Sequence, residues 1–292
     1  MFPNQWGGVV VIAKVVKRIF LVLSIAYISY FLFLYRFEVV DLLETSNPRF
    51  LIASVLCWTL LHLLSPFVAW NLFGALGQPF GLLALVAVHL RRIPAKYLPG
   101  GIWNAAARFA DYKLYGVDVK VVGRYMLLEQ MLFAIVAFVF GAAMLVIGGG
   151  ELSSILLSLC ALMVLLLFVI PMSPYVGNLR WRKYLIVVFL LCVYWSVAGA
   201  SFLFFIQGIA TWELALSQLQ LLGVYSVSWA AGFIAFFAPQ GVGVTEYVAS
   251  HLIFEDSPIY FISVMAIFRV IVLIADMCAF VLSGATYFVK YR

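Results

Sequence analysis

Long apolar runs, interrupted by few charged residues, constrain this chain more than any other feature. Of its 292 residues, 66% are apolar and 10% are charged, whereas soluble domains are about half apolar and a quarter charged. A helix needs about 20 apolar residues to cross a membrane, and its backbone polar groups are satisfied internally. The sequence therefore predicts an all-α fold, that of a polytopic helical membrane protein.

Six apolar runs are long enough to form full membrane spans, at residues 19–35, 50–73, 125–147, 152–170, 184–206 and 259–289. The first is expected to be a retained span, because no small-residue cleavage site of a signal peptide follows it. Two further segments, 80–112 and 214–254, are broken by glycine and proline, and each is expected to form a re-entrant hairpin. An eight-span count is the alternative, because residues 214–238 are long enough to cross by themselves.

The distribution of charge predicts an orientation. The formal net charge is +6, and the lysine and arginine residues lie in short segments between apolar runs. With both termini in the cytoplasm, the basic segments 113–124 and 180–183 fall inside and the acidic segments 36–44 and 255–256 fall outside. We therefore expect a multi-pass protein of the cytoplasmic (inner) membrane, whose basic side faces anionic lipid rather than nucleic acid.

The same order of segments occurs twice. Residues 1–150 and residues 151–292 each contain two spans, a broken hairpin and a third span. Each half crosses three times, so the second half is expected to be inverted relative to the first, within one integral membrane domain. Inverted repeats with broken helices in corresponding places are typical of transporters, whose substrate sites lie near the breaks.

The first break combines cations, a Pro-Gly-Gly sequence and a new helix start. A helix start exposes backbone N–H groups that favour anions, and arginine and lysine bind phosphate well. A basic cytoplasmic loop that only ends the hairpin explains the same residues equally well. The candidate substrate-binding residues here are Arg91, Arg92, Lys96, Tyr97, Pro99, Gly100, Gly101, Trp103, Asn104 and Arg108.

The second break places a carboxylate three residues after a glycine. An ionisable group inside an apolar hairpin is costly, which favours a functional role over ordinary capping of the helix. The candidate substrate-binding residues here are Pro239, Gln240, Gly241, Gly243 and Glu246.

Three further charges, Glu129, Arg269 and Asp276, lie within predicted spans. Arg269 and Asp276 are seven residues apart and share one helix face, which should point into the protein. We expect them to pair with surrounding polar groups, among them Glu129 or Glu246. A structural ion pair and a role in translocation explain this pattern equally well.

No motif in the sequence predicts an enzyme. The four cysteines are isolated, and no two histidine or cysteine residues have a chelating spacing, so we expect neither a metal nor a cofactor. His62, His89 and His251 are scattered, and the sequence assigns them no role. Asp111 and Asp118 are too sparse for the acidic metal site of a membrane-embedded transferase that acts on lipid phosphate.

Two short stretches carry a resemblance to a known family: KYLPGGIW at residues 96–103, followed by Arg108, and PQGVGVTE at residues 239–246. They resemble the signature stretches of the lysylphosphatidylglycerol synthase transmembrane-region family, which includes the flippase half of the bacterial multiple peptide resistance factor. The resemblance implies a stand-alone, lipid-translocating membrane domain that lacks the soluble synthase domain, so lysine transfer to lipid is not expected. Some relatives of this size are associated with polyprenyl-linked glycan or cell-envelope pathways.

We therefore expect a flippase-like transporter that moves a phosphate-bearing lipid across the cytoplasmic membrane. The lipid is either a phospholipid or a polyprenyl-linked intermediate, and membrane lipid is the expected partner. The alternative is a non-transporting membrane subunit that assists an envelope glycosyltransferase or a lipid-modifying enzyme.

Overall fold

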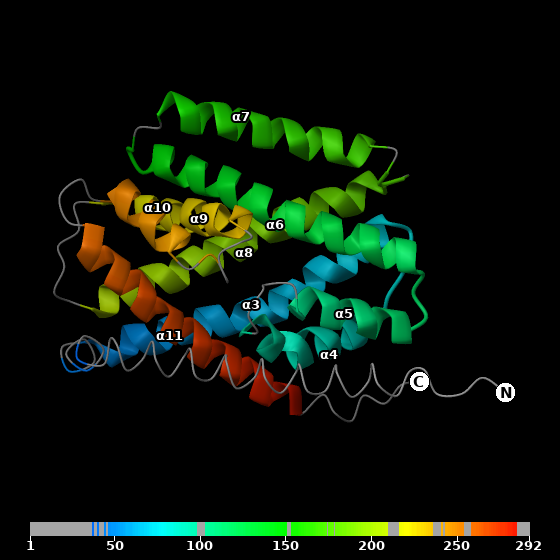
Figure 1. Ribbon diagram of the computed structural model, residues 1–292, viewed down its shortest axis with the longest axis horizontal. Coiled ribbons are helices and arrows are strands. Elements are labelled where there is room, and N and C mark those ends of the chain that lie inside the picture. The colour runs from blue at the N-terminus through cyan, green and yellow to red at the C-terminus, as the bar shows by residue number, and fades with distance from the viewer. Residues whose placement is uncertain are drawn as a thin grey trace, which may run out of the picture.

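The fold is helical throughout the part of the chain that the computed structural model describes (Figure 1). That part comprises residues 46–97, 103–150, 153–173, 175–177, 179–209, 216–235, 241, 243–253 and 258–284, with the single positions 37, 40 and 44. Regular structure within it consists of nine α-helices and two short 3₁₀ helices. The all-α prediction is confirmed. The predicted first span, residues 19–35, lies outside the described residues.

Four helical segments of the described chain are long and apolar enough to cross a membrane. They are α3 (Pro48–Ala75), α6 (Val119–Ile147), α7 (Ser154–Val169) with its extension η2 (Ile170–Met172), and α8 (Trp181–Gly208). Each coincides with a span predicted from the sequence, which supports the prediction of a membrane protein. The last predicted span corresponds to α11 (Pro258–Leu282).

Each of the two broken segments forms a pair of short helices. The first pair is α4 (Leu82–Arg92), continued by η1 (Ile93–Tyr97), and α5 (Trp103–Leu114); the second is α9 (Gln218–Ile234) and α10 (Val244–Ile253). Helices α4 and α5 have 11 and 12 residues, fewer than a membrane crossing needs. In Figure 1 the α4–α5 pair lies toward the right-hand end of the long helices and the α9–α10 pair toward the left-hand end.

Side-chain capping places the start of α6 earlier than the apolar run suggested. The carboxylate of Asp118 accepts hydrogen bonds from the backbone N–H groups of Lys120 at 2.8 Å and Val121 at 3.4 Å. These bonds satisfy donors that a helix start otherwise leaves unpaired, so the helix begins at Val119 rather than near Tyr125. The basic residues before Tyr125 are therefore helical, not part of a loop.

Helices α3 and α8 make the most extensive helix–helix contact of the described chain and form its centre. Ser54 of α3 donates its hydroxyl to the carbonyl of Ser201 at 2.7 Å, and Ser201 donates back to the carbonyl of Ser54 at 2.8 Å. Both serines are fully buried. Small polar residues allow close approach of helices and supply a hydrogen bond where lipid offers none, so this reciprocal pair fixes the register of the two helices.

Helix α9 packs against α6 and α8 through glycines. A Cβ atom on Gly141 of α6 would lie 2.8 Å from the backbone nitrogen of Val227, and one on Gly223 of α9 would lie 2.7 Å from the carbonyl oxygen of Gly141. A Cβ on Gly199 of α8 would lie 2.7 Å from the side chain of Leu222. The backbones are therefore closer than any larger residue permits, as in small-residue interfaces of membrane helices.

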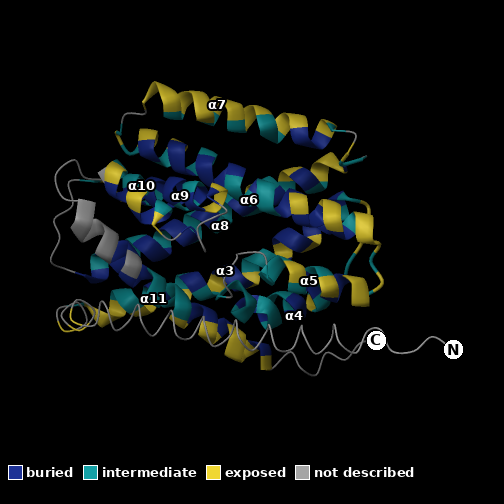
Figure 2. Cartoon of the chain, viewed as in Figure 1, coloured by how far each residue is buried: buried dark blue, intermediate teal, exposed yellow. Residues whose placement is uncertain are grey.

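Helix α7 forms the outer layer of the bundle. It contains no buried residue, and Figure 2 shows it exposed along its length beside α6. Exposed apolar side chains on nearly every turn, such as Ile155, Leu162 and Phe168, suit contact with lipid.

The glycine packing predicts a position-specific loss of stability. Gly141→Ala should lower the thermal unfolding temperature of the detergent-purified protein, because overpacking against a backbone costs about 1–3 kcal/mol. Gly123→Ala is the matched control on the same helix, where a Cβ meets nothing within 4 Å. It should be neutral or stabilising because alanine is the better helix former. Equal unfolding temperatures for the two variants would contradict the close packing of α6 and α9.

Candidate functional site

Arg108 on α5 and Glu129 on α6 form a buried, bidentate ion pair. Arg108 Nη1 donates to Glu129 Oε1 at 2.9 Å, and Nη2 donates to Oε2 at 2.6 Å. The exposed fractions of the two side chains are only 8% and 4%. Tyr125, one turn earlier on α6, donates its hydroxyl to the same carboxylate. The pair attaches the second helix of the first break to the long helix that follows it.

Glu246 links the second break to α11. Its Oε2 accepts the backbone N–H of Gly243 at 2.7 Å, which caps the start of α10. Its Oε1 accepts a hydrogen bond from Arg269 Nε on α11 at 2.6 Å. The buried side chain of Glu246 therefore both caps a helix and forms an ion pair with the partly buried Arg269.

Gly241 holds the second break close to α9. Its φ of +68° lies in the left-handed region, and a Cβ there would be 2.7 Å from the Cα of Gly232. A Cβ on Gly232 would in turn lie 2.1 Å from Thr245 Oγ1. Both the backbone conformation and the close contact require glycine at position 241.

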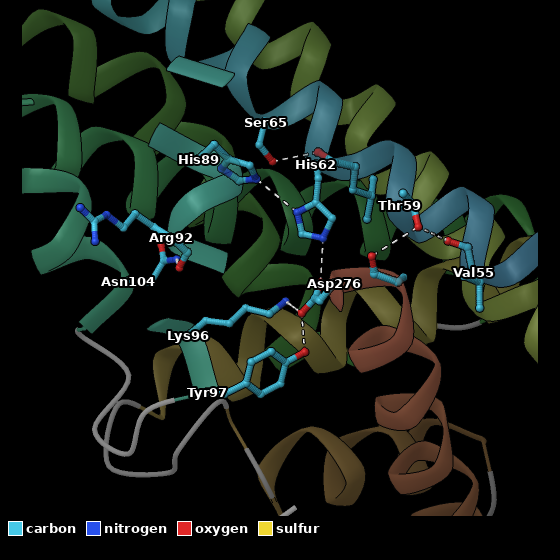
Figure 3. A network of polar contacts seen from close by, with 12 residues as sticks. Val55, Thr59, His62, Ser65, His89, Arg92, Lys96, Tyr97, Asn104 and Asp276 are labelled. Carbon is cyan, nitrogen blue, oxygen red and sulfur yellow. Dashed lines mark hydrogen bonds and ion pairs between the residues drawn. The ribbon is translucent and has the colours of Figure 1, made fainter. Parts of the chain in front are cut away.

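Asp276 of α11 is the centre of a polar network that joins four elements (Figure 3). The exposed fraction of its side chain is 0%. Its Oδ1 lies 2.7 Å from Nε2 of His62 on α3, and its Oδ2 contacts the ammonium group of Lys96 and the hydroxyl of Tyr97, both on η1. His62 Nδ1 lies 3.2 Å from Nε2 of His89 on α4. The network attaches the residues just before the first break to α3 and α11.

Arg92 closes the first helix pair. Its Nε donates to Asp111 Oδ2 on α5 at 2.6 Å, and its Nη2 contacts Asp111 Oδ1. Asn104 Nδ2, near the start of α5, donates to the backbone carbonyl of Arg92 at 2.7 Å. Hydrogen bonds therefore join the end of α4 to α5 at two positions, one near the start of α5 and one near its end.

The structure distributes the predicted site residues over these groups. Lys96 and Tyr97 join Asp276, and the expected pairing of Arg269 with Glu246 is present. Arg91 and Trp103 are partly buried beside the first break. Pro99, Gly100, Gly101, Pro239 and Gln240 lie outside the described residues. Substrate binding by any of these residues stays a prediction.

The histidines were only weak signals in the sequence, and the structure brings two of them, His62 and His89, together with Asp276. Both belong to the Asp276 network, whereas His251 is exposed on α10. A signal for His62 was present in the sequence, since an ionisable residue inside an apolar span is a functional candidate by default. Asp111, considered only as a metal ligand, is the partner of Arg92. Its position on the face of α5 that meets α4 could not be inferred without the packing of the pair.

Comparisons with known proteins leave the family open. The sequence matches no model of a known protein family, and no curated protein matches it significantly. The resemblance at the two breaks therefore remains an expectation.

The Arg108–Glu129 pair predicts a rescue by double substitution. Glu129→Leu leaves the guanidinium buried without a counter-charge and should cost about 3–5 kcal/mol of stability. The double variant Arg108→Met/Glu129→Leu should recover most of that loss, because an apolar pair of similar volume can replace a buried ion pair. Thermal unfolding in detergent measures the stability lost in the single variant and the stability recovered in the double variant. A double variant as unstable as the single one would contradict the pairing.

The two glycines of the second break predict unequal effects of alanine. Gly243→Ala requires a positive φ, +86°, but meets nothing within 4 Å, so it should cost about 1–2 kcal/mol. Gly241→Ala carries the same conformational cost and also collides with the backbone of α9, so its loss should be larger. The rate of limited proteolysis at the break compares the two variants. Equal rates would show that the contact of Gly241 with Gly232 does not constrain the break.

Proposed function

We propose that the protein is a flippase-like transporter of the cytoplasmic membrane that moves a phosphate-bearing lipid, with its two halves arranged as an inverted repeat. The observation that carries the proposal is a pair of ion pairs in corresponding places. Arg108–Glu129 joins α5 to α6, and Glu246–Arg269 joins α10 to α11. Each pair connects the helix that directly follows a break to the next long helix, and the positions of cation and anion are exchanged.

The packing of the long helices supports the same repeat. Helices α3 and α8 are the second predicted spans of their halves, and they meet at the centre through the reciprocal Ser54–Ser201 bonds. A two-fold axis between the halves would relate α3 to α8 in this way. The helix pairs α4–α5 and α9–α10 lie toward opposite ends of the long helices, as expected of hairpins that enter from opposite sides of the membrane (Figure 1).

The first break has the chemistry to bind a phosphate group. Arg91, Arg92 and Lys96 lie within six residues of one another at the end of α4 and in η1. The side chains of Arg92 and Lys96 are 33% and 28% exposed, so an incoming phosphate can compete with their carboxylate partners. Arg108 is far less exposed and would meet the phosphate only after α5 has separated from α6. The cations would thus act in sequence along the path of the headgroup.

Transport would occur by movement of one half against the other across the α3–α8 contact. Packed interfaces change between discrete arrangements rather than deforming continuously. Orientation with both termini in the cytoplasm places the Arg91–Lys96 cations on the cytoplasmic side.

Lipid flipping in reconstituted vesicles tests the proposal. Arg92→Gln removes a phosphate-binding cation, and Glu246→Gln keeps an oxygen that can cap α10 while removing the charge that holds Arg269. Each should slow flipping of fluorescent phosphate-bearing lipids by about tenfold or more, because a charge-assisted hydrogen bond contributes about 1.5–3 kcal/mol. Lys113→Gln, an exposed cation on α5, is the matched control and should flip lipid at the wild-type rate.

Unchanged flipping in both site variants would remove the site assignment. Absence of flipping by the wild-type protein, together with a stably co-purified glycosyltransferase, would favour a non-transporting subunit. Mass spectrometry of lipid that co-purifies with the wild-type protein would identify the substrate.

A further inference from the structure

The His89–His62–Asp276 chain has the geometry of a proton relay, and the proposed phosphate site uses neither histidine. Figure 3 shows His62 between the other two side chains, His89 on α4 and Asp276 on α11. The two gaps are 3.2 Å between His89 Nε2 and His62 Nδ1, and 2.7 Å between His62 Nε2 and Asp276 Oδ1. Both distances lie within hydrogen-bond range, so each proton can pass directly to the next group.

One arrangement of protons satisfies both contacts. An ionised Asp276 accepts the Nε2–H of His62, which leaves His62 Nδ1 as an acceptor for the Nε2–H of His89. Nδ1 of His89, which is partly buried, then carries no proton and can take one up. The chain is therefore set to move a proton inward, from His89 toward Asp276.

Lys96 is the cation that balances the buried carboxylate of Asp276. The Asp276 side chain has no exposed surface, whereas the Lys96 side chain is 28% exposed. Lys96, on η1, is therefore the partner that water or a ligand can reach, and Asp276 is the partner that stays buried. A carboxylate that is buried without a cation is costly, and binding a proton removes the charge.

We propose that this chain is a proton-binding site in which one proton replaces Lys96. When Lys96 leaves, a proton binds His89 Nδ1, the His89 Nε2 proton passes to His62 Nδ1, and the His62 Nε2 proton passes to Asp276 Oδ1. The site gains one proton, Asp276 becomes a neutral acid, and both imidazoles stay neutral with their protons moved from Nε2 to Nδ1. Return of Lys96 drives the same steps in reverse and releases one proton.

The charged surroundings favour the carboxylate over an imidazole as the resting place of the proton. Arg108 acts electrostatically on His89 and stays in place when Lys96 leaves, and a nearby cation disfavours an imidazolium. Other titratable groups of the described chain interact electrostatically with Asp276 or with Tyr97 beside it, namely Tyr194 from α8, Tyr225 from α9 and Arg269 from α11.

The coupling of this site to lipid rests on the proposed function. A lipid phosphate that draws Lys96 away from Asp276 would promote proton binding, and a bound proton would in turn free Lys96 for phosphate. By linkage, each ligand raises the affinity of the site for the other. Exchange of a proton for Lys96 would thus connect transport to the proton gradient.

Infrared spectroscopy of the reconstituted protein tests proton binding without any lipid assay. Lys96→Met imitates departure of the cation, so at neutral pH the variant should show the C=O band of a protonated carboxylic acid, which the wild type lacks. The band should disappear in Lys96→Met/Asp276→Asn. Absence of the band from folded Lys96→Met protein, or its persistence in the double variant, would overturn the proposal.

A kinetic measurement separates a relay from a merely structural network. In the Lys96→Met background, His62→Gln keeps hydrogen-bonding groups but cannot pass a proton from one nitrogen to the other. Proton uptake after a pH jump, followed with an indicator dye, should slow by about a hundredfold, the usual contribution of a positioned acid–base group. His251→Gln, at the exposed histidine of α10, is the control and should leave the rate unchanged. Equal rates in the two variants would overturn the relay.

The two proposals fail separately. An infrared band with no lipid flipping would leave the proton site standing and remove the transport function. Lipid flipping by the wild-type protein, with no infrared band in Lys96→Met, would leave the transport function standing and remove the proton site.

Discussion

The cost of burying charge decides how the helices of this protein are arranged. A charge that leaves water without a partner costs several kcal/mol, so a buried carboxylate has to meet a cation. Glu129, Glu246 and Asp276 are all buried, and their cationic partners are Arg108, Arg269 and Lys96. The partners come from α5, α11 and η1. Pairing therefore also determines which segment around a break contacts which long helix.

Close packing of the helix backbones brings the charged side chains near enough to one another to form these ion pairs. Helix α9 lies against α6 and α8 at distances that only glycine allows, and Gly241 lies against Gly232 of α9 for the same reason. In a membrane, association of helices depends on such contacts, because lipid is as apolar as the side chains it would replace. The glycines thus hold α9 and α10 deep enough in the bundle for Glu246 to reach Arg269.

A buried ion pair contributes less to net stability than its short distances suggest. Its larger effect appears when one partner is lost or is replaced by a ligand. Desolvation offsets most of the attraction between the charges, but the loss of one partner leaves the other strongly destabilised. A ligand that substitutes for the lost partner therefore has a large effect on packing. In the two proposals, phosphate substitutes for the carboxylate beside Lys96, and a proton substitutes for Lys96 beside Asp276. One contact thereby links the proposed lipid site to the proposed proton site.

The sequence by itself determined the helical class and most of the helix positions, because apolar runs of membrane length have few alternatives. It also predicted two broken segments, since glycine and proline interrupt helices locally, and each of these segments contains two separate helices. The apolar run did not predict the start of α6, because Asp118 caps the helix before that run begins. The pairing of Glu246 with Arg269 could be anticipated because few charges were available inside the apolar segments.

Only the tertiary structure decided the membership of the Asp276 network. Helical periodicity indicates which side of α11 carries Asp276, but not which helices pack against that side. His62 is 214 residues away in sequence, and Tyr97 is 179 residues away. Their meeting depends on α3, η1 and α11 converging, and that convergence is set by the packing of the whole bundle rather than by any local pattern.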